Sequence, residues 1–323
     1  MKRLFLLLIA AIACGVGAMA QDSRVATLQH GSNFRAYYGT DALWLAHTDA
    51  ANGDVITLSE GDFTGFQITK ALTIRGEGMY KTTIGNSPSF SIPKESTHPL
   101  FLEGLGLTNS AGISGNDGSG VAIISKCYTY NSTNTFSITT CKATILESNF
   151  YTISGWGAHL KANSNSNITI INSILPGIGY SNNGRFFIQN CVISGTMSTV
   201  HSSIENSIIF GVSNLDGTNT TSHCLVKADS SGFSDSWYIA TTAPEPDPWG
   251  ETPEVVLWND LFTGNYHLTA EASQNYKGTD GTEVGIYGGA YPYDITPDYP
   301  LVKNIEVKGI HENGKLSVKI NVE

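Results

Sequence analysis

The residues best suited to ligand chemistry lie in the middle of the chain. The segment SGWGAHLK brings together Trp156, His159 and Lys161, an aromatic ring beside an imidazole and an amine. Arg185 and His201 follow in later segments of the same region. Aromatic faces stack on sugars, arginine can clamp a sugar carboxylate, and histidine titrates near neutral pH. These five residues are therefore the candidate ligand-binding residues, for a polysaccharide or cell-surface glycan. The alternative is that they are ordinary solvent-facing residues.

Carboxylates, which the cleavage of polysaccharides requires, are scarce in this region. Residues 102–210 contain four of them, Glu103, Asp117, Glu147 and Glu205, and no Asp-x-Asp, Asp-Asp or His-x-Asp pair. Calcium-dependent lyases need clustered acidic ligands and a base, and glycoside hydrolases need two carboxylates at a defined separation. The sequence therefore favours a protein without its own catalysis, and no metal or cofactor is expected.

An enzyme with an atypical site stays open as an alternative. A polysaccharide lyase or glycoside hydrolase could use Arg185 with His201 or Lys161. A bound calcium ion is expected only if the protein is a polysaccharide lyase. Convergence of Asp117, Glu147 and a basic side chain in one groove would favour this alternative.

The elements that must position these residues are short and repeated. Six-residue segments with a shared pattern recur at intervals of 16 to 28 residues, after a looser first member at Ile74. They begin at Leu102, Ile124, Leu146, Ile170, Ile188 and Ile204. A period near 20 with variable insertions is typical of a solenoid, whose turns can grow loops without disturbing the stacked strands. Short β-branched strands broken by Gly, Asn and Ser favour β structure over helices.

The third position of each segment predicts a tight bend between two strands. It is occupied by Gly104, Lys126, Ser148, Asn172, Asn190 and Asn206. Gly and Asn tolerate left-handed backbone angles. Asn172, Asn190 and Asn206 follow one another, and stacked Asn side chains can form a hydrogen-bonded ladder. The alternative, a β-sandwich, needs longer alternating strands.

These repeats resemble the right-handed parallel β-helix of the pectin-lyase-like superfamily, as found in secreted bacterial proteins, from about Gly53 to Gly289. The resemblance implies an all-β fold, a single-stranded right-handed parallel β-helix over residues 53–290. It is specific for fold and weak for activity. A Pro-rich loop at residues 243–254 interrupts the last coils, and residues 265–289 resemble a closing coil.

Two further segments flank the predicted β-helix. Residues 21–52 form an N-terminal segment whose residues 40–51 predict an amphipathic capping helix, with Thr40 as N-cap and Leu43, Ala46 and Ala50 on one face. Residues 291–323 form a C-terminal extension. It alternates polar and apolar residues about Asn313-Gly314, which predicts a β-hairpin. We expect this hairpin to cover the C-terminal edge of the coil or to pair with a neighbour.

The repeat register places polar residues in two outward columns. One column is acidic, and we interpret it as a solvated face: Glu103, Glu147 and Glu205. The other holds Asn167, Arg185 and His201 on consecutive coils, which are about 4.8 Å apart.

Four cysteines, Cys127, Cys141, Cys191 and Cys224, lie within the repeats, and an even number in an exported protein permits disulfides. Cys127 and Cys191 share one repeat position three coils apart. That separation is roughly 14 Å and excludes a bond between them, so we expect buried thiols there. Their spacing shows no zinc motif.

The first twenty residues predict a cleavable signal peptide. Lys2 and Arg3 precede an apolar run of ten residues, and Ala18-Met19-Ala20 is a small-x-small cleavage site. A lipoprotein signal ending at Cys14 is the alternative, which would leave a lipid anchor. The protein is thus expected to be secreted or on the outer cell surface, with the periplasm also compatible. No stretch is long enough for a transmembrane helix.

Composition narrows the class of partner. The formal net charge is −10, whereas nucleic acids and anionic membranes require a basic face. We therefore expect no nucleic-acid partner. The leading hypothesis is an exported β-helix protein that binds polysaccharide or a partner protein along its stacked faces. The alternatives are the enzyme described above and a structural spacer or adhesin.

Overall fold

The computed structural model describes residues 23–108, 111–116, 118–131, 136–152, 160–163, 165–179, 184–199, 201–243, 255–298, 302–308 and 317–322. The predicted signal peptide and almost all of the Pro-rich loop 243–254 lie outside these residues. No helix within the described part of the chain is long and apolar enough to cross a membrane.

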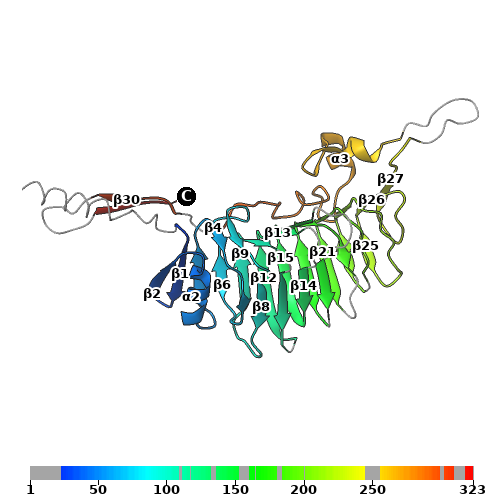
Figure 1. The fold of residues 1–323 in the computed structure, drawn as a ribbon. Helices are drawn as coiled ribbons and strands as arrows, with labels where there is room; N and C mark the ends of the chain where they lie inside the picture. Colours follow the sequence, from blue (N-terminus) through cyan, green and yellow to red (C-terminus); the bar gives the residue numbers. More distant parts are fainter. Residues whose placement is uncertain are drawn as a thin grey trace, which may run out of the picture.

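The chain winds into a right-handed parallel β-solenoid of about seven turns, as predicted (Figure 1). Successive turns add parallel strands to three sheets. In spatial order, sheet A contains β2 (Asn33–Tyr38), β1 (Val25–His30), β3 (Val55–Leu58), β6 (Thr73–Arg75), β9 (Leu100–Glu103), β12 (Gly120–Ser125), β15 (Cys141–Leu146), β18 (Asn167–Ile171), β21 (Arg185–Gln189), β23 (Ser203–Glu205) and β25 (Thr220–Ser222).

The other two sheets complete each turn. Sheet B contains β4 (Gly61–Phe63), β7 (Thr82–Ile84), β10 (Gly106–Thr108), β13 (Tyr128–Asn131), β16 (Asn149–Thr152), β19 (Ile174–Leu175), β22 (Val192–Ile193), β24 (Ile208–Ile209), β26 (Leu225–Lys227) and β27 (Trp237–Ile239). Sheet C contains β5 (Gln67–Ile68), β8 (Ser89–Ile92), β11 (Gly112–Gly115), β14 (Phe136–Thr139), β17 (Leu160–Asn163) and β20 (Ile178–Gly179).

The core is a set of inward columns that run along the coil. Because side chains alternate along a strand, every second residue points inward and meets its equivalent in the next turn. The clearest column lies in sheet A and is fully buried: Ile74, Leu102, Ile124, Ile145, Ile170, Ile188 and Ile204. Stacked isoleucine side chains, with Leu102 at one level, fill this space in every turn, which makes the core continuous.

The register corrects the sequence analysis at one repeat. Ile145, and not Leu146, pairs with Ile124 and Ile170. The bend of this turn is therefore Glu147, with φ of 46°, instead of Ser148. Two adjacent apolar residues compete for the inward position here, and the strand pairing selects the first.

The bend position carries left-handed backbone angles in consecutive turns. The residues there, hereafter the bend column, are Gly104, Lys126, Glu147, Asn172, Asn190 and Asn206, with φ between 45° and 64°. The predicted tight bend is therefore present at Asn172, Asn190 and Asn206.

The four cysteines are buried and free. Cys127 lies next to Ser148 of the following turn, and the same inner column continues through Ser173 to Cys191. Three turns therefore separate Cys127 from Cys191, as predicted, and no disulfide joins them.

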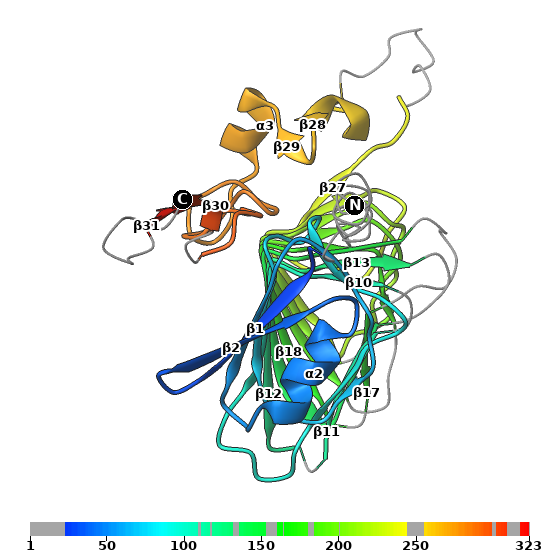
Figure 2. The same cartoon turned by 60° about the vertical axis from the view of Figure 1, so that its left-hand side comes forward.

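The N-terminal end of the coil is closed by helix α2 (Ala42–Asp49), which lies across the opening (Figure 2). Leu43, Ala46 and Ala50 are buried, as predicted. The expected N-cap is wrong, because the helix begins one residue later and Asp41 takes that position without a side-chain capping bond. Strands β1 and β2 form an antiparallel hairpin that extends sheet A beyond β3, a feature that the sequence analysis did not predict.

The segment after β27 leaves the coil and folds over sheet B. It forms the 3-10 helix η1 (Trp258–Leu261), β28 (Phe262–Gly264), β29 (His267–Leu268) and α3 (Ala270–Asn275). This module packs on outward residues of sheet B and forms a second apolar cluster with Ile174, Val192, Ile208 and Leu225. The expected closing coil at residues 265–289 is therefore wrong, because these residues add no strand to the three sheets.

Residues 276–298, hereafter the strap, run back along the outside of the coil toward its N-terminal end (Figure 1). The strap bonds to the bend column at Asn206 through Thr279, at Asn172 through Ile286 and Gly288, and at Lys126 through Asp298. Gly289 has φ of 82°, and a Cβ atom there would lie 2.2 Å from Asn190 Nδ2, so only glycine fits.

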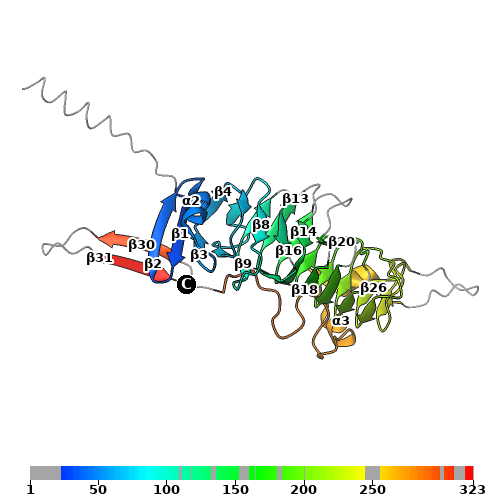
Figure 3. The ribbon, with the colours of Figure 1, turned by 90° about the horizontal axis from the view of Figure 1, so that it is seen from below.

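The predicted C-terminal hairpin is present as β30 (Val302–Lys308) and β31 (Ser317–Val322), which pair antiparallel. It lies toward the end of the coil that carries β1 and β2 (Figures 1 and 3). The expectation that it covers the C-terminal edge of the coil is therefore wrong. The strap explains the difference, because it returns the chain to the opposite end.

Candidate functional site

The outer face of sheet A carries the proposed polar column of Asn167, Arg185 and His201, and strand pairing adds Lys142, which the sequence analysis missed. Lys142, Asn167 and Arg185 pair directly across β15, β18 and β21, and all three are exposed. His201 occupies the equivalent position before β23 and is also exposed. Adjacent strands are about 4.8 Å apart, so the column presents donors at regular intervals along the coil.

A second outward column runs beside the first and contains a residue that the sequence analysis missed. Thr144, Thr169 and Phe187 pair across the same three strands. Phe187 is 44% exposed, and it lies two residues from Arg185 on the same face of β21. The signal was in the sequence, because the inward position of Phe186 requires its neighbour to point outward.

The remaining predicted ligand residues do not join this surface. Lys161 lies in β17 of sheet C, where it pairs with Ser137 and Gly179. It is therefore on a different sheet from Arg185. Trp156 and His159 lie outside the described residues, as does Asp117.

The predicted acidic column is wrong at Glu147 and in the exposure of Glu103, whereas Glu205 stays in register with Gln189, as predicted, and is half-exposed. Strand pairing aligns Glu103 with Ser125, whereas Glu147 belongs to the bend column. Glu103 is only 3% exposed, so it is not part of a solvated face. Its carboxylate accepts hydrogen bonds from Arg75 Nε at 3.0 Å and from the backbone of Asp298 in the strap at 3.3 Å.

Glu147, which the enzyme alternative would place beside a basic side chain, lies next to Lys126. Lys126 Nζ lies 3.2 Å from Glu147 and 2.6 Å from both Asp298 and the carbonyl of Thr296. Burial lowers the pKa of Lys126, but its bonds to Asp298 and Glu147 raise it more, so the amine stays charged. Burial raises the pKa of Glu147 despite the nearby amine.

This pair has no access for a polymer. The Lys126 side chain is 4% exposed, and the strap contributes two of its three oxygen partners. The arrangement therefore fastens the strap to the coil. Within the described ranges, no cluster of three or more His, Cys, Asp or Glu residues could hold a metal ion.

Comparison of the chain with protein-family models, curated proteins and solved structures finds no match. The functional argument therefore rests on the geometry above.

Proposed function

We propose that this is an exported β-solenoid protein, related to the pectin-lyase-like superfamily, that binds a polysaccharide along the outer face of sheet A without cleaving it. The observation that carries the proposal is that Arg185 and exposed Phe187 lie on the same outward face of β21. Arg185 is also in register with Asn167 and Lys142 on the two preceding turns. An aromatic ring beside regularly spaced donors is suited to a ligand that is itself a repeating chain.

The charge of this surface favours an acidic polymer. Lys142 and Arg185 place two positive charges on one column of a chain whose net charge is −10. Arginine binds carboxylates in a bidentate manner, and exposed aromatic rings pack on the apolar faces of sugars. A uronic-acid polymer meets both requirements. A protein partner and a spacer role are the alternatives that the experiment must separate.

The proposal is tested by measuring the binding of the exported chain to a panel of neutral and uronic-acid polysaccharides. Arg185→Ala and Phe187→Ala should each weaken binding of an acidic polymer by about tenfold, the effect of losing one charged hydrogen bond or one stacked ring. Lys94→Ala is the matched control, because Lys94 is an exposed lysine outside sheet A.

Three outcomes would contradict the proposal. The first is the absence of binding to any polymer, which would favour a protein partner or a spacer. The second is unchanged binding in both sheet A variants. The third is an increase in ultraviolet absorbance from unsaturated products, which would show a lyase.

A further inference from the structure

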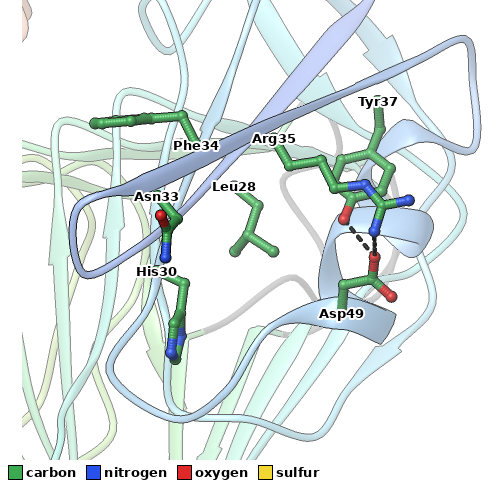
Figure 4. Close-up of a pocket in the computed structure, with 7 residues that line it drawn as sticks. All are labelled: Leu28, His30, Asn33, Phe34, Arg35, Tyr37 and Asp49. Carbon is green, nitrogen blue, oxygen red and sulfur yellow. Dashed lines mark hydrogen bonds and ion pairs between the residues drawn. The ribbon is translucent and has the colours of Figure 1, made fainter.

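A hollow of about 560 Å³ lies at the N-terminal end of the coil, between the β1–β2 hairpin and the end of α2 (Figure 4). Its apolar floor is formed by Leu28 and Tyr37, which are 5% and 8% exposed. The polar groups around it belong to His30, Asn33, Arg35 and Asp49. Phe34 also lines the hollow. Leu28, His30, Arg35 and Tyr37 lie on the hairpin face opposite that of Gln29, so most of the hollow lies on the opposite face of the hairpin from the outer face of sheet A.

A buried carboxylate orients His30 at the edge of this hollow. Nδ1 of His30 lies 2.8 and 3.0 Å from the two oxygens of Asp54. Asp54 is 7% exposed and also accepts a hydrogen bond from the backbone of Ala51 at 2.7 Å. The carboxylate favours the tautomer with the proton on Nδ1, so Nε2 of the neutral ring is an acceptor. The side chain of His30 is 64% exposed.

On the side of the hollow opposite His30, the carboxylate of Asp49 orients the donor groups of Arg35 and Tyr37. Asp49 accepts hydrogen bonds from both Arg35 and the hydroxyl of Tyr37 (Figure 4). Burial and the Asp49 carboxylate raise the pKa of Tyr37, so its hydroxyl stays protonated. Only one guanidinium nitrogen of Arg35 bonds to Asp49, and guanidinium carries five N–H donors. Donors therefore remain for a ligand.

These groups indicate the chemistry of the ligand. The charge of Arg35 is balanced by Asp49, and Asp54 lies beside His30, so the hollow offers no excess positive charge for an anion. It offers instead an acceptor, several donors and an apolar floor within one concave surface. Neutral sugars present this combination, because their hydroxyls both donate and accept and their ring faces are apolar.

We propose that this hollow binds a single neutral sugar unit, with Arg35 donating to one hydroxyl and Nε2 of His30 accepting from another. The site is separate from the outer face of sheet A and does not depend on the polymer proposal. It is suited to the end or a side branch of a glycan, because it lies beyond the first turn, at the N-terminal end of the coil.

The experiment is saturation-transfer NMR of the full chain with methyl glycosides of neutral hexoses and of uronic acids. We expect transfer to at least one neutral glycoside. His30→Gln and Arg35→Ala should each weaken that binding by about tenfold, the effect of losing one hydrogen bond made by an oriented group. Gln29→Ala is the control, because it changes β1 on the opposite face.

Asp54→Asn tests the positioning of His30. It should weaken binding although residue 54 does not line the hollow, while Arg185→Ala should leave this binding unchanged. Circular dichroism and the unfolding midpoint establish that each variant folds. The proposal is overturned by the absence of transfer to every neutral glycoside, by a preference for uronic acids, by binding that survives both His30→Gln and Arg35→Ala, or by equal loss in folded Gln29→Ala.

Discussion

At the scale of single residues, the inside of sheet B shows how the coil tolerates polar atoms in its core. One inner column, directly before the strands of sheet B, consists of small cysteine and serine side chains: Cys127, Ser148, Ser173, Cys191, Ser207 and Cys224. Ser148, for example, accepts from the backbone of Cys127 at 3.1 Å and donates to the carbonyl of Leu146 at 2.7 Å. Each hydroxyl satisfies the backbone near the bend, so its burial is not penalised.

The thiols in and near this column should be inert in the folded protein. Burial raises the pKa of Cys127, Cys191 and Cys224 to about 12 and that of Cys141 to about 11. Thiolate is the reactive form, so iodoacetamide at pH 8 should leave all four unmodified. Peptide mass spectrometry should show full alkylation after unfolding in guanidinium. Modification at an equal rate before and after unfolding would show that this core is open.

His47 should make the N-terminal cap sensitive to acid. Burial, aided by the charge of Lys70, lowers its pKa from 6.5 to about 4, and its Nε2 accepts a hydrogen bond from the backbone of Thr69. A histidine whose pKa is lower in the folded than in the unfolded protein contributes stability that is fully present above the unfolded pKa. This contribution is lost as the pH falls from the unfolded pKa through the folded pKa.

We therefore expect stability to decrease between pH 6.5 and 4, by roughly 2 kcal/mol from this residue after allowance for its partial exposure. Urea unfolding at several pH values measures the effect. His47→Gln should flatten the curve over this interval, whereas the exposed His98→Gln should not. Parallel curves for wild type and His47→Gln would refute the assignment.

At the scale of elements, the strap is fastened by side chains whose chemistry is specific. Asn172 Nδ2 donates to the carbonyls of Ile286 and Gly288 at 2.9 and 2.8 Å, and Asn172 is 2% exposed. The bend side chain at Asn206 likewise bonds to Thr279 of the strap. The bend column therefore holds the strap in addition to turning the chain.

Asn172→Asp should release this part of the strap. A carboxylate cannot donate and would face two carbonyl oxygens in a buried place, at a cost of about 2–4 kcal/mol. Proteolysis within residues 276–298 should accelerate while circular dichroism still reports the coil. Asn167→Asp makes the same change at the exposed start of β18, the strand that precedes Asn172, and should have little effect. Equal protection of the strap in both variants would contradict this role.

The coil could be predicted from sequence because its determinants are local. The bend residues Asn172, Asn190 and Asn206 and the inward isoleucines each recur once per turn, so the repeat period of the solenoid was visible in the sequence. The register failed at Leu146 because two neighbouring apolar residues satisfied the same pattern. The strap could not be predicted, because its bonds join residues far apart, such as Asn172 and Gly288, which are separated by 116 positions.

The candidate ligand residues likewise separate into those that the local repeat predicts and those that depend on long-range structure. The alignment of Asn167 with Arg185 follows from counting within repeats, and strand pairing agrees. The position of Lys161 depends on which sheet its strand joins, which the repeat pattern does not specify. The hollow with His30 and Asp54 depends on a hairpin added to the first turn, so no periodic signal indicates it.

At the scale of the whole molecule, we expect the strap to couple the unfolding of turns that are not neighbours. Solenoid turns ordinarily contact only their neighbours, so stability is nearly a sum of adjacent interfaces. Here one segment contacts the bend column from Asn206 to Lys126. It also buries Val284 and Ile286 against the outward residues of sheet B. Unfolding of the central turns should therefore be coupled through the strap.

Two truncations separate the contribution of the strap from that of the terminal hairpin. A chain that ends at residue 298 loses β30 and β31, which pair with each other, so its urea midpoint should stay close to that of the full chain. A chain that ends at residue 275 also loses Val284, Ile286 and two of the three oxygen partners of Lys126, and should lose at least about 3 kcal/mol and bind more of an apolar dye. It should also unfold over a broader range of urea, because the turns no longer share a common segment. If the two truncated chains unfold alike, the strap does not couple the turns, and the coil is an ordinary solenoid stabilised by neighbouring contacts alone.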